Sequence, residues 1–96
     1  MFKDEYHPKI KKDLKLIDKS VINEIKKEHI DKIFIAPYKC NELKGELSGI
    51  RAYHFKKNKT EYRICFFINE EINTLYFLMI GKRENFYELL KQRLNK

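Results

Sequence analysis

The sequence has few of the residues that interrupt or cross-link a chain. Its 96 residues include three Gly, two Pro, two Cys and no Trp. With so little Gly and Pro, we expect regular helices and strands joined by short connections. Two cysteines that are far apart in sequence, Cys40 and Cys65, make neither a disulfide framework nor a zinc site. We expect Cys65, within an apolar run, to lie in the core and Cys40 to lie in a loop.

Long apolar segments are also missing. No stretch approaches the roughly 18 apolar residues that span a bilayer, and Met1–Tyr6 has no apolar region of the signal-peptide kind. We therefore expect a cytoplasmic protein that does not contact a membrane. The length fits a single domain, residues 1–96, with a modest core, because a chain of this size buries only roughly 60% of its surface on folding.

Charge of one sign dominates. The 21 Lys and Arg outnumber the 14 Asp and Glu, which gives a net charge of +7. Such a field favours polyanionic partners: nucleic acid, a membrane surface or an acidic protein. A generic protein from a Lys-rich proteome has the same balance, so the charge alone does not decide the function.

The first third of the chain has helical periodicity. Pro8 suits the first turn of a helix whose apolar positions are Ile10, Leu14 and Ile17. Asp18 or Ser20 can cap a second helix, which ends before Pro37. The apolar stripe of this second helix contains Val21, Ile22, Ile25, His29, Ile30, Ile33 and Phe34.

The second half changes to a period of two. Alternation predicts strands over residues 50–57 and 62–68, with a turn at Asn58–Thr60, and the apolar run 72–80 predicts a central strand. In the first strand, Arg51, Tyr53, Phe55 and Lys57 share one face, and Ala52, His54 and Lys56 share the other. Residues 84–94 predict a last helix with Phe86, Leu89, Leu90 and Leu94 buried.

These elements predict an α+β fold. We expect a small antiparallel sheet of three to four strands, the fourth being a short edge strand before Pro8, packed against two N-terminal helices and followed by a C-terminal helix. Helices would cover one face of the sheet and leave the other open to solvent. An open, basic sheet face suits a strand of nucleic acid.

Three segments carry a resemblance to a known family. They are Leu43–Gly49 before the sheet, Tyr53–Lys56 followed by Glu61–Ile64, and Ile80–Glu84 with Tyr87 soon after. In order and spacing they resemble the RelE/ParE superfamily of toxins from type II toxin–antitoxin systems, and more closely its RelE branch. The resemblance covers essentially the whole chain.

The resemblance implies an endoribonuclease that cleaves mRNA in the ribosomal A site and needs no metal or cofactor. In this reaction the 2′-hydroxyl attacks the adjacent phosphate, leaving a 2′,3′-cyclic phosphate and a free 5′-hydroxyl. The reaction requires a proton acceptor, cations that stabilise the phosphorane and a proton donor for the leaving oxygen. The sequence has no spacing typical of metal ligands.

The resemblance also implies roles for individual residues. Lys56 matches the general base, Arg63 a phosphate-binding arginine, Arg83 the residue that stabilises or protonates the leaving group, and Tyr87 the tyrosine that stacks on or orients the RNA. His54 departs from the pattern, because the RelE branch usually has Lys or Arg there. Since an imidazole is itself a capable base, the role of base stays open between His54 and Lys56.

The placement of these residues agrees with the predicted elements. Arg63 lies across a short hairpin from Lys56, and Arg83 and Tyr87 would be neighbours if the last helix began by Arg83. Further cations are expected to bind the RNA backbone: Lys44, Arg51, Lys57, Lys59 and Lys82.

Two other functions remain open. One is a ParE-like toxin that poisons DNA gyrase by binding, and the other is a non-catalytic basic module that binds RNA or ribosomes. A toxin of this superfamily also implies a RelB-like antitoxin partner of acidic or amphipathic character. Such a partner would displace the last helix or cover Arg63 and Arg83.

Overall fold

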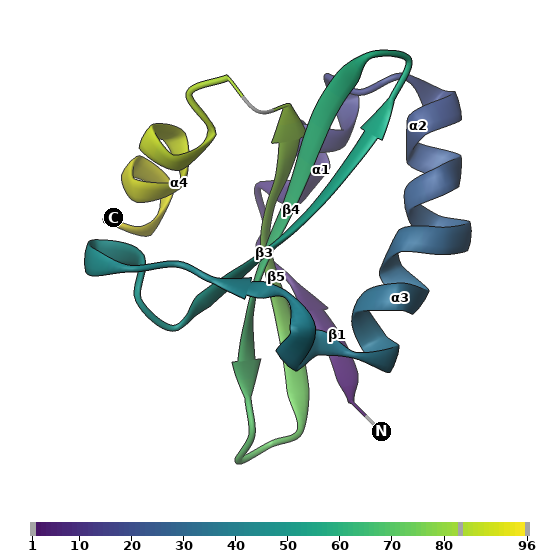
Figure 1. The fold of residues 1–96 in the computed structure, drawn as a ribbon. Coiled ribbons are helices and arrows are strands. Elements are labelled where there is room, and N and C mark those ends of the chain that lie inside the picture. The colour runs from purple at the N-terminus through teal and green to yellow at the C-terminus, as the bar shows by residue number, and fades with distance from the viewer. Residues whose placement is uncertain (1, 83, 96) are drawn as a thin grey trace.

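A mixed five-stranded sheet forms the centre of the molecule. The structure is a computed structural model that describes residues 2–82 and 84–95. The strand order is β1-β5-β4-β3-β2 (Figure 1). The strands are β1 (Lys3–Tyr6), β2 (Asn41–Glu42), β3 (Ile50–Lys57), β4 (Thr60–Asn69) and β5 (Thr74–Lys82).

The predicted sheet was partly correct. The antiparallel meander of β3, β4 and β5 is confirmed, and so is the short edge strand before Pro8. The count of three to four strands was wrong, because the two-residue β2 pairs with the free edge of β3. The all-antiparallel arrangement was also wrong, since β1 runs parallel to β5.

The longer helices lie between β1 and β2 and after β5. The first helix is α1 (Ile10–Lys15); α2 (Lys19–Glu24), the π-helix η1 (Ile25–His29) and α3 (Ile30–Ile35) follow as one continuous rod (Figure 1). Two 3-10 turns, η2 (Pro37–Lys39) and η3 (Gly45–Leu47), lead into the sheet, and α4 (Phe86–Leu94) ends the described chain. Within residues 2–82 and 84–95, no helix combines the length and apolar character needed to cross a membrane.

The π turn follows from the spacing of the buried residues in the rod. Val21, Ile25, His29 and Ile33 are all buried and recur every four residues. An α-helix has 3.6 residues per turn, so a four-residue repeat drifts away from the sheet. The wider π turn takes up the extra residues and keeps all four side chains on the sheet. The predicted second helix and its end before Pro37 are confirmed. Of the two predicted caps, Asp18 or Ser20, Asp18 occupies the N-cap position, but its side chain makes no capping hydrogen bond.

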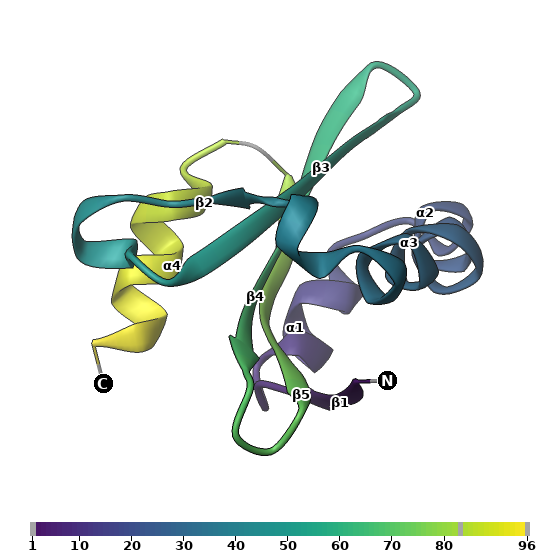
Figure 2. The same cartoon turned by 60° about the horizontal axis from the view of Figure 1, so that its bottom comes forward.

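Apolar side chains cover both faces of the sheet. On one face α1 and the rod pack on Phe55, Ile64 and Phe77. On the other face α4 inserts Phe86 and Leu90, which are 1% and 0% exposed. Figure 2 shows α4 on the opposite side of the sheet from α2 and α3.

The expectation that helices cover only one face was therefore wrong. Ala52, Cys65 and Met79 make the second face apolar, and this surface has to be covered. The last helix begins at Phe86 rather than at Glu84. Leu89 and Leu94, predicted to be buried, are 48% and 37% exposed.

A buried ion pair clasps α4 to the rest of the molecule. The Arg93 guanidinium donates to both Asp13 carboxylate oxygens, with Nη2–Oδ1 at 2.7 Å and Nη1–Oδ2 at 2.9 Å. Arg93 Nη1 also donates to the Leu78 carbonyl oxygen at 2.7 Å, and the Ile80 backbone N–H donates to Asp13 Oδ2 at 3.1 Å. The clasp joins α1, β5 and α4, which come from the two ends of the chain.

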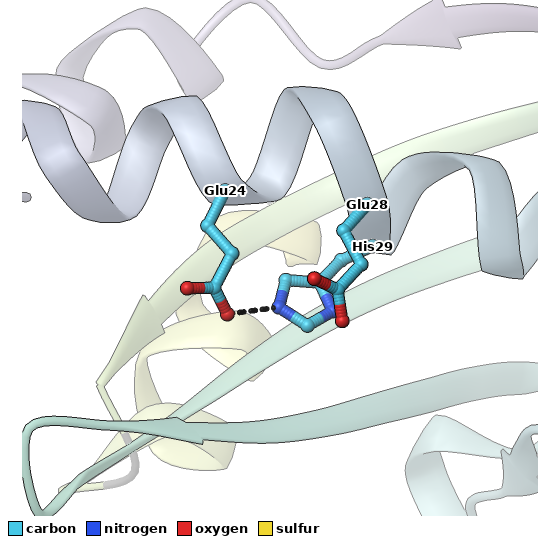
Figure 3. Close-up of side chains that lie close together, drawn as sticks. All are labelled: Glu24, Glu28 and His29. Carbon is cyan, nitrogen blue, oxygen red and sulfur yellow. Dashed lines mark hydrogen bonds and ion pairs between the residues drawn. The ribbon is translucent and has the colours of Figure 1, made fainter.

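A second polar network ties the helical rod to β3. His29 Nε2 lies 2.8 Å from Glu24 Oε2 (Figure 3), and His29 Nδ1 lies 2.7 Å from the Tyr53 hydroxyl. Lys57 Nζ lies 2.9 Å from Glu24 Oε1. Hydrogen bonding to Lys57, and then to His29, holds the pKa of Glu24 below its ordinary value.

Loss of one member of the clasp is expected to destabilise the fold strongly. Arg93→Met leaves the Asp13 carboxylate buried without its cation, which costs about 3 to 5 kcal/mol in the free energy of unfolding. The matched control is Lys91→Met, which breaks an exposed pair with Glu46 on the same helix and costs less than about 1 kcal/mol. Urea unfolding measures both values.

A double variant separates charge from packing. Asp13→Asn with Arg93→Met removes both charges but keeps an acceptor for the Ile80 N–H, so we expect it to regain a large part of the loss. A change below about 1 kcal/mol for Arg93→Met alone contradicts the assignment of the clasp.

The Glu24 network predicts a particular dependence of stability on pH. A carboxyl group whose pKa is lowered by folding stabilises the folded state above its ordinary pKa of 4.5. This contribution is lost as the pH falls through the lower, folded-state pKa. The free-energy difference between wild type and Glu24→Gln should therefore shrink from about pH 6 to about pH 3. Lys57→Met should weaken this dependence, and parallel curves for wild type and Glu24→Gln would contradict it.

Candidate functional site

The β3–β4 hairpin sets the positions of the polar side chains on the second face. Asn58 and Lys59, the two turn residues, have φ angles of 53° and 67°. Positive φ at both positions is typical of the two-residue turn that matches the twist of a hairpin. In the resulting register His54 lies directly opposite Arg63, and Lys56 lies opposite Glu61.

Arg63 is the centre of the cluster. Its Nε donates to His54 Nδ1 at 3.3 Å, and its guanidinium carbon lies 4.7 Å from the centre of the Tyr87 ring. Its Nη2 lies 3.9 Å from Glu61 Oε2. The Arg63 side chain extends from β4 and contacts His54 of β3 and Tyr87 of α4. It is 15% exposed, so it still reaches solvent.

Burial raises the pKa of two nearby groups that are protonated at neutral pH even at their ordinary values. It raises the pKa of the Tyr87 hydroxyl, an effect that the Arg63 charge partly opposes. Burial also raises the pKa of the Cys65 thiol to about 12, again against the influence of Arg63. At neutral pH Tyr87 is therefore a hydrogen-bond donor, and Cys65 is a core residue rather than a nucleophile.

A groove of about 870 Å³ opens beside Arg63. Cations outnumber carboxylates among its described lining residues, which are Lys56, Lys59, Thr60, Glu61, Arg63, Lys82, Glu84, Asn85 and Tyr87. The groove thus combines a positive field with an aromatic ring and hydrogen-bond donors. These groups suit a phosphate and an adjacent base.

Four of the five residues expected at the catalytic centre come together in the structure. Lys56, Arg63 and Tyr87 line the groove, and His54 contacts Arg63. The fifth, Arg83, lies outside the described residues. Because α4 begins at Phe86, the helical spacing expected to link Arg83 with Tyr87 does not apply.

Four of the five additional cations divide between the two faces of the sheet, and the fifth, Lys44, lies in a loop. Lys59 and Lys82 line the groove. Arg51 instead donates to the carbonyl oxygens of Tyr38 and Cys40, at 3.1 and 2.8 Å. Lys57 pairs with Glu24 on the face covered by α1 and the rod. Lys44 is exposed just before η3 and is not among the lining residues.

Glu61 is the site residue that the sequence analysis missed. Its Oε2 lies 3.3 Å from His54 Nδ1, within the cluster formed by Arg63 and Lys56. Strand alternation places Glu61 two residues before Arg63 and therefore on the same face. That pattern is sufficient to place Glu61 at the site, although the resemblance implied roles for cationic and aromatic residues alone.

Glu24, Glu28 and His29 have ligand atoms close enough together to hold a metal ion (Figure 3). Their charges are already balanced, since Lys57 pairs with Glu24 and Lys32 pairs with Glu28. Both nitrogens of His29 have partners, Glu24 and Tyr53. The cluster lies on the face covered by α1 and the rod, opposite the groove. We interpret it as a structural network.

One family model matches most of the chain. A family model described as a ParE-like toxin of type II bacterial toxin–antitoxin systems matches residues 5–91. A search of curated protein sequences finds no match.

Solved structures share the fold at low sequence identity. The free form of a double mutant of the E. coli toxin RelE is 17% identical over 97% of each chain, with a TM-score of 0.74. The RelBE2 toxin–antitoxin complex of Mycobacterium tuberculosis is 18% identical over 85% of this chain and 98% of that chain, with a TM-score of 0.69. The conserved hypothetical protein HP0892 from Helicobacter pylori is 25% identical over 90% of this chain and 99% of that chain, with a TM-score of 0.57.

The family match spans the sheet, the groove and most of α4. The structural matches add the same arrangement of helices and strands. This chain belongs to the family of ParE-like toxins of type II bacterial toxin–antitoxin systems, within the RelE/ParE superfamily.

Proposed function

We propose that this toxin is an endoribonuclease that cleaves mRNA, acting in the ribosomal A site without a metal ion. The observation that carries the proposal is the position of Arg63, held between His54 and the Tyr87 ring at the edge of a cationic groove. A bare electrostatic surface would not need an imidazole and a phenol in contact with the same guanidinium.

The cluster supplies the groups that the reaction needs. Arg63 can bind the scissile phosphate through its two Nη groups and stabilise the phosphorane charge. His54 or Lys56 accepts the proton of the attacking 2′-hydroxyl. Arg83 remains the proposed donor to the leaving oxygen. Since Arg63 covers one face of the Tyr87 ring, an RNA base would stack on the other face.

The family description favours a second candidate function. A ParE-like toxin that poisons DNA gyrase acts by binding, so it needs a basic surface but no proton acceptor beside a phosphate site. Inhibition of gyrase supercoiling by the purified chain, without cleavage of mRNA, would support this candidate. A chain that binds RNA or ribosomes without either effect would be a non-catalytic module.

Primer extension on messages from cells that express the chain tests the nuclease proposal. We expect cuts within codons that disappear when translation is blocked. Arg63→Ala should lower cleavage about 100-fold or more, because it removes a group that binds the transition state. Lys26→Ala, which removes one positive charge from the exposed side of the helical rod, should cleave normally.

Three results bear on this test. Equal cleavage by wild type and Arg63→Ala contradicts the role of Arg63. Cleavage that persists without translation contradicts the requirement for the ribosome. Absence of cleavage by the folded wild-type chain contradicts the nuclease function itself.

We also propose an antitoxin partner of acidic or amphipathic character. A hollow of about 690 Å³ between α1 and α4 has an apolar part, with Leu16 and Leu89, and the cations Lys9 and Lys12 at its side. Such a surface suits an amphipathic segment with acidic residues. The partner would displace α4 or cover the groove.

Hydrogen exchange identifies the region of the toxin that this partner contacts. In a complex with an antitoxin that neutralises this toxin, we expect altered amide exchange in α4, in the β3–β4 hairpin, or in both. Unchanged exchange in both elements, in a complex that neutralises the toxin, contradicts the proposed binding region.

A further inference from the structure

One nitrogen atom of the candidate site has two neighbours, one of which requires that nitrogen to be protonated and the other to be unprotonated. His54 Nδ1 lies 3.3 Å from Arg63 Nε and 3.3 Å from Glu61 Oε2. The Arg63 Nε–H is a donor, so it needs an unprotonated Nδ1. The Glu61 carboxylate is an acceptor, so it needs Nδ1–H.

The choice between these neighbours decides what the other ring nitrogen can do. When a neutral His54 accepts from Arg63, its proton lies on Nε2, and Nε2 is a donor. When Nδ1–H donates to Glu61, Nε2 carries the free lone pair and can accept a proton. A carboxylate that holds one imidazole nitrogen in this way is a common means of preparing the other as a base.

Phosphate binding changes this balance in one direction. A guanidinium prefers a phosphate to a neutral imidazole, because the phosphate offers two charged acceptors to its planar fork. Arg63 would then turn its donors to the phosphate. Glu61 stays beside His54, since its backbone is fixed by the pairing of β3 with β4.

We propose that Glu61 is a positioning residue that takes over His54 Nδ1 when a phosphate binds Arg63, and that His54 Nε2 is the catalytic base. The proposal rests on the nuclease function proposed above. Lys56 then acts as a cation that binds the phosphate. In the register of β3 and β4 it lies directly opposite Glu61, and it lines the groove beside Arg63.

The reaction balances with this assignment. The 2′-hydroxyl gives its proton to His54 Nε2 while its oxygen forms a bond to phosphorus. The bond between phosphorus and O5′ breaks, and O5′ takes a proton from a cationic side chain or from water. His54, now carrying protons on both nitrogens, donates to Glu61 and later returns the Nε2 proton to solvent.

Other titratable groups also surround His54. Glu61 and Arg63 face it from β4, and Lys56 lies two residues along β3. Lys32, Lys39 and Cys40 line a second hollow that reaches His54 from the side of α3 and η2. Of these groups, Glu61 is the carboxylate within hydrogen-bonding distance of the ring.

Nitrogen NMR of the His54 ring tests the switch without any cleavage reaction. At about pH 8, where an imidazole is mostly neutral, we expect the Nε2–H tautomer in the free chain. Saturating inorganic phosphate should shift the ring to the Nδ1–H tautomer. In Glu61→Gln the phosphate-induced shift should be lost, whereas Glu88→Gln, an exposed carboxylate change on α4, should retain it. The same tautomer with and without phosphate in the wild type overturns the proposal.

Cleavage kinetics on translating ribosomes supply the second measurement. Glu61→Gln should lower kcat by about tenfold or more with little change in KM, since it affects proton transfer rather than binding. The rising limb of its pH–rate profile should also move, and Glu88→Gln should match the wild type. Normal kcat and an unchanged profile in Glu61→Gln overturn the role of Glu61.

The two measurements separate the two proposals. If the wild type shows the tautomer shift but cleaves no RNA, the nuclease function fails and the catalytic role of His54 fails with it. If the wild type cleaves RNA but shows neither the shift nor a dependence on Glu61, only the switch is overturned.

Discussion

The register of the β3–β4 hairpin is the constraint on which the rest of the molecule depends. Because side chains alternate along a strand, a slip of one residue moves every side chain to the other face of the sheet. Such a slip would turn Phe55 out of the core and His54 into it. The register is held by the two-residue turn at Asn58 and Lys59 and by the burial of Tyr62 and Ile64 beneath the helices.

The second face joins an apolar core directly to a charged groove. Phe86 and Leu90 of α4 cover the part of the sheet around Cys65. Tyr87, on the same helix, lies at the edge of this apolar cluster and contacts Arg63. Arg63 lies at the boundary, beside a fully buried thiol. Burial raises the pKa of Cys65, whereas the hydrogen bond of Arg63 to His54 lies on the exposed side of this boundary. A short helix therefore completes both the core and the candidate site.

Much of the candidate site was predictable from local pattern. The alternation in β3 placed His54 and Lys56 together, and it also placed Arg51 and Lys57 with Tyr53 and Phe55 on the other face. The structure has the same division, with Arg51 bound to loop carbonyl oxygens and Lys57 paired with Glu24. Arg51 and Lys57, predicted from their charge to bind RNA, therefore lie on the face opposite the groove.

The sequence by itself determined the main helices and strands, and the face on which each residue of β3 lies, because both depend on neighbours a few positions away. It also predicted that β3, β4 and β5 pair in order, but it did not determine which segments distant in sequence pack on one another. A nine-residue helix with two buried side chains can cover either face, and a two-residue strand such as β2 has no periodicity at all. Only the tertiary structure put α4 on the second face, joined Asp13 to Arg93 and gave His54 its two opposed neighbours, since these contacts depend on how distant segments pack.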